Sequence, residues 1–247
     1  MRRRTPNSIF VERAQRKLLA RLPELDLRAI VRELEPLLTA ERRARFDAVF
    51  SQRLDAVTVL MDAPYDPHNG AAVLRSCDAF GVHGLHVVER AGIEFLAARQ
   101  VARGSEQWVH VRTYPDSKGA LDALVSSGHE LVATHPKGEL LPEDLRHIPR
   151  VCLVLGNERD GIHEELSRAC RRSVRVPMRG FAESLNVSVT AAILLQHATT
   201  GRAGDLSEAE RLLLYARAMV LTIDHAAEVL LAKGIELGPE IFASAET

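Results

Sequence analysis

From Ala56 onward, short apolar runs alternate with longer stretches of helical periodicity, and this alternation constrains the fold more than any other feature. The runs that predict strands are 57–61, 85–88, 131–134, 151–155 and 174–176, and the stretches between or after them that predict helices are 68–80, 115–127, 162–170 and 182–200. Strands that alternate with helices predict an α/β fold, in which a mostly parallel sheet is flanked by helices. The run 151–155 has no polar residue, as expected for a strand buried on both faces.

Apolar residues at spacings of three and four also predict helices at both ends of the chain. Residues 10–52 predict three short helices, because Pro23 and Pro36 interrupt the pattern. One amphipathic helix is predicted from 206 to about 233, with Asp205 or Ser207 as its N-cap. We therefore expect a basic helical N-terminal extension (1–55), a central α/β domain (56–201) and a C-terminal helical extension (202–247).

The net charge of −1 conceals an uneven distribution. Residues 1–55 hold 13 Lys and Arg against 8 Asp and Glu, a net charge of +5, and the remaining residues have a net charge of −6. A basic segment favours a polyanionic partner such as a nucleic acid. Solvated helix faces have the same composition, so both interpretations stay open.

Three features predict a cytoplasmic protein without a membrane span. The longest apolar runs are far shorter than the ~18 residues that a bilayer span needs. The basic start is followed by Glu12 and Arg13, where a signal peptide needs its apolar core. Cys77, Cys152 and Cys170 form no CxxC motif and leave one thiol unpaired in any disulfide scheme, which fits a reducing compartment. We also expect no bound metal.

The first candidate site is a helix that follows the first predicted strand. Asp66 is a typical N-cap, Pro67 favours the first helical position, and Gly81 favours the position after the helix. Asn69 and Arg75, six positions apart, lie on different faces of this helix. The helix nevertheless starts at the carboxyl end of a strand, where open α/β sheets bind ligands. The alternative is a capped amphipathic helix whose arginine lies along the protein surface.

A second candidate is the polar loop 156–161, directly after the fourth predicted strand. Gly156 and Gly161 are spaced as in a phosphate-binding loop, but Ile162 and His163 stand where that motif needs Lys and Ser or Thr. No GxGxxG motif occurs either, so the common nucleotide-binding folds are disfavoured. The loop stays a candidate site, and the alternative is a strand-to-helix turn with Gly161 at positive φ.

The third candidate lies at the start of the last predicted helix of the α/β region. Ser184, Asn186 and Ser188 are polar in a segment that is otherwise apolar on all sides. Such a helix is expected to be buried, and buried polar side chains need partners. Their position after a loop that contains Pro and Gly predicts that they bind something there. A capping role for Ser184 is the alternative, but it leaves Asn186 unexplained.

The order and spacing of the three motifs resemble those of one family. The resemblance rests on Pro67-His68-Asn69 with Arg75-Ser76-Cys77-Asp78-Ala79, on Gly156-Asn157-Glu158, and on Val176-Pro177-Met178-Arg179-Gly180 with Ser184-Leu185-Asn186-Val187-Ser188. Over roughly residues 40–200, the chain resembles the SpoU/TrmH family of SPOUT-superfamily RNA ribose 2′-O-methyltransferases. Gly104-Ser105 with Trp108, and the lead-in Leu38-Thr39-Ala40-Glu41-Arg42, look like the tRNA-modifying TrmH branch.

The resemblance implies a sheet whose C-terminal segment is threaded as a trefoil knot, a homodimer, and a site near the subunit interface. It implies S-adenosylmethionine as the cofactor, bound in the knot mostly through backbone groups. The positions of this chain that match the cofactor loops are Thr134, Gly156, Asn157, Val176, Met178, Ser184 and Leu185.

The implied activity is methylation of a ribose 2′-hydroxyl in RNA, and the TrmH branch implies a guanosine in the tRNA D-loop. A ribose hydroxyl is a poor nucleophile that needs a base or a positive field. Arg75 matches the family's catalytic position, with Asn69, Glu158, Ser184 and Asn186 completing a hydrogen-bond network. Because arginine stays protonated up to about pH 12, Arg75 either stabilises the developing alkoxide or holds a phosphate, and its protonation state stays open.

Three alternatives remain. His68 is a rival base with a better suited pKa, although it sits at the helix start, where a capping role also fits. Ribosomal RNA is an alternative substrate, although residues 1–55 are too few and wrongly patterned for the small α/β RNA-binding domain that the ribosomal-RNA relatives often carry, and residues 1–37 match nothing in the family. The tail 202–247 also holds 4 basic against 8 acidic residues, whereas the tRNA enzymes tend to have a more basic tail. The third alternative, an RNA-binding relative that has lost catalysis, is disfavoured because the candidate catalytic residues are intact.

Overall fold

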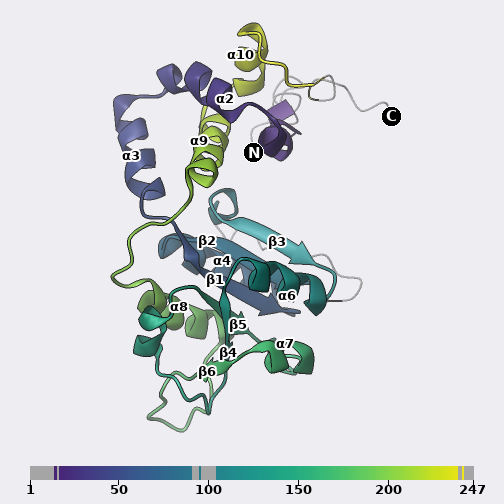
Figure 1. Cartoon of the computed structure of the whole chain (residues 1–247), viewed down its shortest axis with the longest axis vertical. Helices are drawn as coiled ribbons and strands as arrows, with labels where there is room; N and C mark the ends of the chain where they lie inside the picture. The colour runs from purple at the N-terminus through teal and green to yellow at the C-terminus, as the bar shows by residue number, and fades with distance from the viewer. Residues whose placement is uncertain (1–13, 16, 91–94, 96–103, 239–240, 242–247) are drawn as a thin grey trace, which may run out of the picture. The chain divides into compact units, whose positions relative to one another are not determined.

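The computed structural model describes residues 14–15, 17–90, 95, 104–238 and 241 (Figure 1). Residues 10–13 of the first predicted helix lie outside this described part. The chain divides into two compact units, one formed by Met1–Ser51 with Leu206–Thr247 and the other by Gln52–Asp205. The strands of the described residues all belong to the second unit.

Within the described residues, the sheet of the second unit has six strands in the order β3-β2-β1-β5-β4-β6, and every pairing is parallel. The strands are β1 (Leu54–Asp62), β2 (Val82–Val88), β3 (His110–Tyr114), β4 (Glu130–Thr134), β5 (Val151–Leu155) and β6 (Arg172–Val174). The predicted α/β fold with a parallel sheet is therefore confirmed. Because parallel strands end at a common edge, the loops that follow β1, β4, β5 and β6 gather at that edge.

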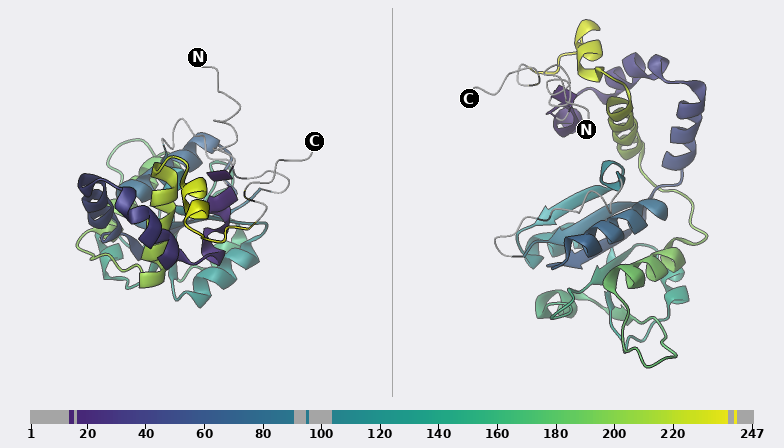
Figure 2. Two further views of the ribbon diagram at one scale, coloured as in Figure 1. Left: turned by 90° about the horizontal axis from the view of Figure 1, so that it is seen from above. Right: turned by 180° about the vertical axis from the view of Figure 1, so that it is seen from behind.

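Helices cover both faces of this sheet (Figures 1 and 2). On one face, α4 (Pro67–Ala79), the 3-10 helix η4 (Pro142–His147) and α8 (Val187–Thr199) share a core with Val59 and Leu153. On the other face, α6 (Ser117–Ser126) and α7 (Glu164–Ala169) share a core with Leu60 and Cys152. Successive residues of a strand point to opposite faces, so β1 and β5 contribute to both cores and are buried on both sides, as their apolar runs predict.

Two strands differ from the sequence prediction. Strand β3 is not predicted because it lies at the edge of the sheet, where the polar side chains of His110 and Arg112 interrupt any apolar run. Strand β6 ends at Val174, where the sequence prediction begins it. Its pairing with β4 is supported by an ion pair that hydropathy does not reveal, because Arg172 donates to both carboxylate oxygens of Glu130, at 2.6 and 2.9 Å.

Helix α8 begins later than predicted. It starts at Val187 because Asn186 is its N-cap, and the Asn186 side chain accepts a hydrogen bond from the Ser188 N–H at 2.8 Å. Residues 175–186 form a loop without helix or strand. Ser184 therefore lies in this loop and does not cap the helix.

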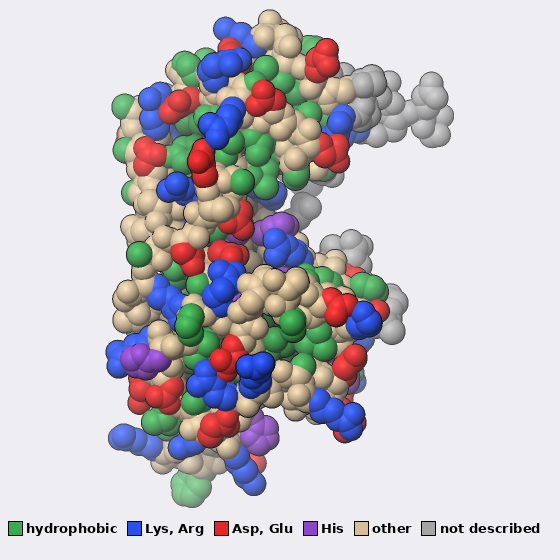
Figure 3. Space-filling model, viewed as in Figure 1, with side chains coloured by type: hydrophobic (Ala, Val, Ile, Leu, Met, Phe, Trp, Pro, Cys, Tyr) green, Lys and Arg blue, Asp and Glu red, His purple; other side chains and the backbone are tan. Residues whose placement is uncertain are grey.

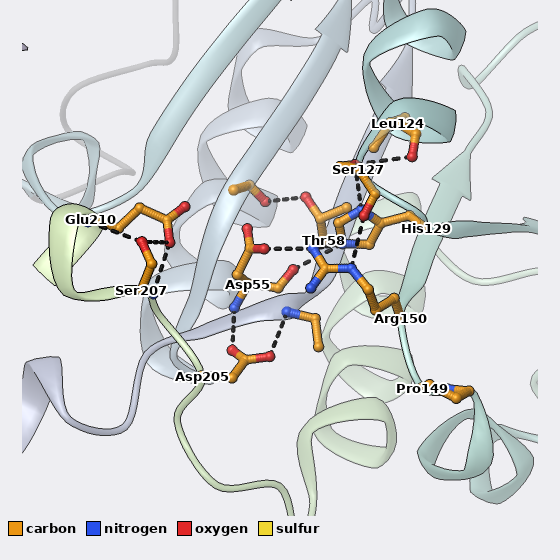
Figure 4. Close-up of polar contacts among 12 residues, drawn as sticks. Asp55, Thr58, Leu124, Ser127, His129, Pro149, Arg150, Asp205, Ser207 and Glu210 are labelled. Carbon is orange, nitrogen blue, oxygen red and sulfur yellow. Dashed lines mark hydrogen bonds and ion pairs between the residues drawn. The ribbon is translucent and has the colours of Figure 1, made fainter.

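The two ends of the second unit are hydrogen-bonded to each other (Figure 4). The carboxylate of Asp205 accepts from the backbone N–H groups of Asp55 and Ala56, at 2.6 and 3.0 Å. The N–H of Asp205 donates to the carbonyl oxygen of Arg53 at 3.0 Å. Asp55 in turn pairs with Arg150, at 2.5 Å. Asp205 thus holds the start of β1 rather than capping a helix.

A short 3-10 helix precedes β3. It is η3 (Ser105–Gln107), and Gly104 before it adopts the left-handed conformation at φ 91°. The Ser105 hydroxyl donates to Asp78 of α4 at 3.1 Å, and the same carboxylate pairs with the buried Arg53. The Gly-Ser pair noted in the sequence therefore anchors the start of β3 to α4.

The first unit is helical and contains both ends of the chain. Its described elements are a helical segment at 17–21, η1 (Leu22–Glu24), α2 (Leu27–Leu34), η2 (Glu35–Leu37), α3 (Ala40–Phe50), α9 (Glu208–Thr222) and α10 (Ala226–Ala232). Pro23 and Pro36 lie in the two 3-10 turns that interrupt the helices. Helix α2 packs against α9, and the ring of Phe50 lies edge-on to that of Tyr215, with centroids 5.1 Å apart. The N- and C-terminal helices thus form one unit.

The C-terminal helix is broken where the sequence predicts a continuous one. Helix α9 is capped by Ser207, which exchanges hydrogen bonds with Glu210 in a capping box. It ends at Thr222, and His225 has a φ of 57°. An L-residue in this left-handed conformation cannot continue a right-handed helix, so α10 starts anew.

Basic and acidic side chains are interspersed over the helices of the first unit on the face drawn in Figure 3. Arg28 pairs with Glu208 at 2.6 Å, and Arg21 pairs with Glu24 at 3.2 Å. The net positive charge of residues 1–55 is thus partly matched by acidic neighbours. None of the helices in the described part of the chain has the length and apolar character needed to cross a membrane.

Candidate active site

A cavity of about 460 Å³ lies where β4, β5 and β6 end. Its walls come from Thr134 at the end of β4, from the loop 156–161 after β5, and from the loop 175–186 before α8. All seven residues expected to bind the cofactor line it: Thr134, Gly156, Asn157, Val176, Met178, Ser184 and Leu185. The second and third motifs thus build one cavity together with the end of β4.

The loop after β5 is a tight turn. The backbones of Asn157 and Gly161 exchange two hydrogen bonds, at 2.9 and 3.2 Å, and Gly161 has a φ of 73°. A Cβ on Gly156 would lie 2.4 Å from the Gly161 carbonyl carbon, which only glycine avoids. The turn interpretation is confirmed, and the same turn lines the cavity, so the loop stays a candidate site.

Asn157 lines this cavity and has a buried side-chain donor without a partner in the described part of the chain. Its Oδ1 accepts from the N–H groups of Arg159 and Asp160, at 3.0 and 2.8 Å, which fixes the orientation of the side-chain amide. The Nδ2 atom is then left without a hydrogen-bond partner among the described residues, although Asn157 is only 7% exposed. A buried donor without an acceptor lowers the stability of the folded protein, and a ligand that accepts a hydrogen bond from it removes this penalty.

A chain of three polar side chains runs beside the cavity. Asn69 Nδ2 donates to Glu158 Oε1 at 2.6 Å, and Asn186 Nδ2 donates to Asn69 Oδ1 at 3.0 Å. Asn186 Oδ1 accepts from the backbone and the hydroxyl of Ser188. The structure therefore brings together one predicted catalytic residue from each of the three motifs.

The Glu158 carboxyl is held in its ionised form. Burial alone raises its pKa, but the hydrogen bonds from Asn69 and from the backbone N–H groups of Tyr65 and Asp66 outweigh burial and lower the pKa below its ordinary value. A carboxylate only accepts hydrogen bonds, so the NH₂ of Asn69 must face it. The carbonyl oxygen of Asn69 is then directed to Asn186.

Arg75 and Ser184 do not join this chain. Arg75 lies on the exposed side of α4 and makes no hydrogen bond or ion pair with the described residues. Ser184 lines the cavity, but its hydroxyl has no hydrogen-bond partner within the described part of the chain. The rival base His68 is exposed at the start of α4, with its Nδ1 3.0 Å from Asp66 Oδ1. Hydrogen bonds from His68 lower the pKa of Asp66.

Three further residues at this edge were not predicted from the sequence. His135 and Glu183 line the cavity, and His135 directly follows β4, which is the signal that could have identified it. Asp62, at the end of β1, is 1% exposed and accepts from the backbone N–H of His163 at 2.7 Å. A charged residue that ends a buried strand was the available signal for Asp62. The described residues contain no group of three or more side chains placed to hold a metal ion.

Residues 56–196 match the model of the SpoU rRNA Methylase family, which is more than half of the chain. The tRNA (guanosine(18)-2′-O)-methyltransferase of Thermus thermophilus is 35% identical over 170 residues, or 66% of this chain and 84% of that protein. The TrmH/SpoU tRNA modifying enzyme of A. aeolicus has a TM-score of 0.65 and 28% identity, over 73% of this chain and 95% of that one. The SpoU methyltransferase AviRb from Streptomyces viridochromogenes, solved with AdoMet, has a TM-score of 0.54 and 28% identity, over 61% and 62% of the two chains. With these matches and the site geometry together, the chain belongs to the SpoU rRNA methylase family.

Proposed function

We propose that this protein transfers a methyl group from S-adenosylmethionine to a ribose 2′-hydroxyl of RNA, and that the target is a guanosine in the tRNA D-loop. The observation that carries the proposal is the hydrogen-bonded chain of Glu158, Asn69 and Asn186 beside the cavity. The names of the T. thermophilus and A. aeolicus relatives support tRNA as the substrate. We propose a cytoplasmic location on the basis of this proposed substrate.

The cavity fits S-adenosylmethionine, which supplies a methyl group activated by a sulfonium charge. The buried Nδ2 of Asn157 offers a donor, and Val176 and Leu185 offer apolar surface for a purine ring. Backbone groups of 156–157 and 176–178 complete the walls. The role of each of these residues in binding is part of the proposal.

We further propose that the cavity lies in a trefoil knot. The segment 138–140 runs alongside 173–175, with hydrogen bonds of 2.9 and 3.0 Å between the backbones of Leu140 and of Ser173 and Arg175. A Cβ on Gly138 would lie 2.6 Å from the Val174 carbonyl carbon, so these segments pack as closely as two backbones can. Close packing of this kind supports a chain that is threaded beside its own earlier loop.

Arg75 is the proposed catalytic residue. Arginine stays protonated in proteins, so its guanidinium acts on the 2′-oxygen as a positive charge that stabilises the developing alkoxide. Asn69, on the same helix, is held by Glu158 and Asn186 and is the proposed positioning residue for the ribose. Ser184 contributes from the cavity wall.

We propose that the protein is a homodimer in which α8 contributes to the interface. Helix α8 buries Leu194 and Leu195 against its own subunit, yet Val189 is 46% exposed. Phe181 and Leu185, just before this helix, are also exposed. Apolar surface of this kind normally marks an interface.

Substitution of Ala192 by Arg tests the dimer. This residue of α8 is half-buried, and an unpaired charge at a packed interface is strongly destabilising. Sedimentation and methyl-transfer rates measured on the same sample should show that both properties are lost together. A folded, fully active monomer would contradict the dimer proposal.

Methyl transfer is tested with radiolabelled S-adenosylmethionine, a tRNA transcript and a matched transcript that has 2′-deoxyguanosine at the D-loop target. Label should enter the first RNA and not the second. Ribosomal RNA from a strain that lacks the gene is the second substrate, because the acidic tail of this chain favours that alternative. Label in ribosomal RNA alone would show that ribosomal RNA, and not tRNA, is the substrate. Binding of the cofactor without methyl transfer to either RNA would identify an inactive relative.

A further inference from the structure

An aromatic ring with two arginines stands beside the candidate site. The guanidinium carbons of Arg90 and Arg159 each lie 4.4 Å from the centroid of the Tyr65 ring. Tyr65 follows β1, Arg90 follows β2 and Arg159 lies in the turn after β5, so three neighbouring strands supply the group from their carboxyl ends. We call these three residues the arginine–tyrosine stack.

The backbone ties this stack to the polar chain of the site. The N–H of Tyr65 donates to Glu158 Oε2 at 3.2 Å, while the other oxygen of Glu158 accepts from Asn69. Arg159 is the next residue after Glu158 and its N–H is held by Asn157. The backbones of Tyr65 and Arg159 are therefore fixed relative to the residue proposed to orient the ribose, and Arg90 lies against the same Tyr65 ring.

The positive charge of the stack is not neutralised within the described part of the chain. Neither Arg90 nor Arg159 forms an ion pair with a described carboxylate. Glu158 is occupied by the N–H donors named above, and the carboxylate of Asp66 is engaged by His68. Two like charges held against one ring repel each other, and an anion bound to either guanidinium group offsets that repulsion.

We propose that Arg90 and Arg159 bind backbone phosphates of the RNA next to the methylated nucleotide, and that Tyr65 positions both guanidinium groups. This inference rests on the proposed function, because it assumes that an RNA ribose is held at Asn69. The planar guanidinium fork matches a phosphate in two parallel hydrogen bonds. Nucleobase stacking on Tyr65 is disfavoured, because the two cations already cover the ring.

The test compares Arg90→Gln, Arg159→Gln and the double variant with the wild-type protein. Each single change should raise the KM for RNA roughly tenfold and reduce the salt slope of RNA binding by about 0.7–0.9, because one phosphate contact is lost. The kcat at saturating RNA and the Kd for S-adenosylmethionine should stay within about twofold. Tyr65→Leu removes the ring but no charge, and it should raise the KM for RNA because the two guanidinium groups lose their support. Tyr65→Phe keeps the ring and should leave the KM unchanged.

The matched control is Arg168→Gln. Arg168 is an exposed arginine of the same unit, but it is paired with Glu164 along α7. An equal rise in KM in this variant, or an unchanged KM and salt slope in the double variant, overturns the inference. RNA binding is measured by fluorescence anisotropy as well as by turnover. Absence of methyl transfer in the wild type would therefore refute the proposed function, while the binding results would still decide the role of the stack.

Discussion

Asn69 and Asn186 lie 117 positions apart in the chain, and the side-chain NH₂ of Asn186 donates to the side-chain oxygen of Asn69 at 3.0 Å. The contact joins the first turn of α4 to the cap of α8. Because Asn69 also donates to Glu158, both ends of its amide are occupied by protein groups with fixed roles. Its orientation is therefore determined before any substrate binds.

Asn69→Asp should disable the site more severely than Asn69→Ala. The aspartate would place a second carboxylate where the present Nδ2–Oε1 distance to Glu158 is 2.6 Å, and two carboxylates that close cannot both stay ionised. We expect kcat to fall by about 100-fold or more, as for loss of a preorganised polar group in an active site. Thermal unfolding should show a lower Tm for the aspartate variant than for alanine. Equal effects of the two substitutions would show that repulsion between the two carboxylates adds nothing to the loss of the amide.

Arg75→Ala should abolish methyl transfer with little change in the Kd for S-adenosylmethionine. Arg75 does not line the cavity and has no polar partner among the described residues, so its removal should leave the fold and the cofactor walls unchanged. Arg75→Lys should also be poorly active, because a point charge does not replace a planar fork. Turnover and calorimetric cofactor binding are the measurements. Wild-type turnover of the alanine variant would remove Arg75 from the mechanism.

Gly156→Ala should weaken cofactor binding. The added Cβ would lie 2.4 Å from the backbone of Gly161, so the turn that lines the cavity must move. We expect the Kd for S-adenosylmethionine to rise roughly tenfold or more, since a displacement of about 1 Å can cost ~100-fold in function.

Gly119→Ala is the matched control for this change. Gly119 lies in α6 and has only ordinary contacts at 3.4 Å or beyond around an added Cβ. Cofactor affinity should stay at the wild-type value, and stability should rise slightly because alanine favours helices over glycine. A Gly156 variant that binds the cofactor as well as this control would show that the turn tolerates the shift.

Stability should fall below about pH 6.5 because of His86. Burial, followed by the positive charge of Arg112, lowers the pKa of His86 from 6.5 to about 4 in the folded state. The unfolded state therefore takes up a proton below pH 6.5 that the folded state does not, and stability present at pH 7 is lost as the pH falls toward 4. Between pH 7 and pH 5 the loss from this residue is about 2 kcal/mol.

Urea unfolding at pH 7 and pH 5 checks this expectation. His86→Gln removes the titrating ring and keeps a hydrogen-bonding group near Tyr114, whose hydroxyl lies 2.8 Å from His86 Nδ1. The variant should lose less stability than the wild type between the two pH values. His129, whose pKa is also lowered chiefly by burial, should contribute to the remaining slope in the same direction. Identical slopes in the two proteins would assign the acid sensitivity to other groups.

Substitution of exposed arginines of α3 tests whether the basic N-terminal region contacts RNA phosphates. Deletion of residues 1–37 would also remove α2, whose buried Ile30 and Leu34 belong to the core of the first unit, so a loss of RNA binding would be ambiguous. Arg42→Gln with Arg45→Gln leaves that core in place. If these residues contact phosphates, the salt slope of RNA binding should fall by about 0.7–0.9 for each. An unchanged slope would identify a solvated surface.

The sequence pattern was most informative where burial is complete. The apolar runs in β1 and β5 predict central strands because both faces of those strands are covered, whereas β3 escapes prediction because it is half-exposed at an edge. The break at His225 was hidden because positive φ is uncommon outside glycine and leaves no hydropathy signal.

The candidate site follows the same division. The sequence indicates that Asn186 needs a partner, but its partner is supplied by the packing of α4 against α8, which no local spacing encodes. The stack on Tyr65 is invisible for the same reason, since its arginines come from two other strands. The residues that line the cavity were predictable from the family resemblance, whereas the roles of the candidate catalytic residues stay predictions.

The hydrogen bonds from the backbone N–H groups of Asp55 and Ala56 to the Asp205 carboxylate join the two ends of the sheet-containing unit. Its first and last residues are adjacent, so the chain leaves it next to the point where it arrived. A body with this property can be transplanted into a loop of another protein, or circularly permuted, without stretching either junction. The flanking helices can then be replaced without disturbing the sheet-containing unit. Different flanking segments would allow the same catalytic unit to act on different RNAs.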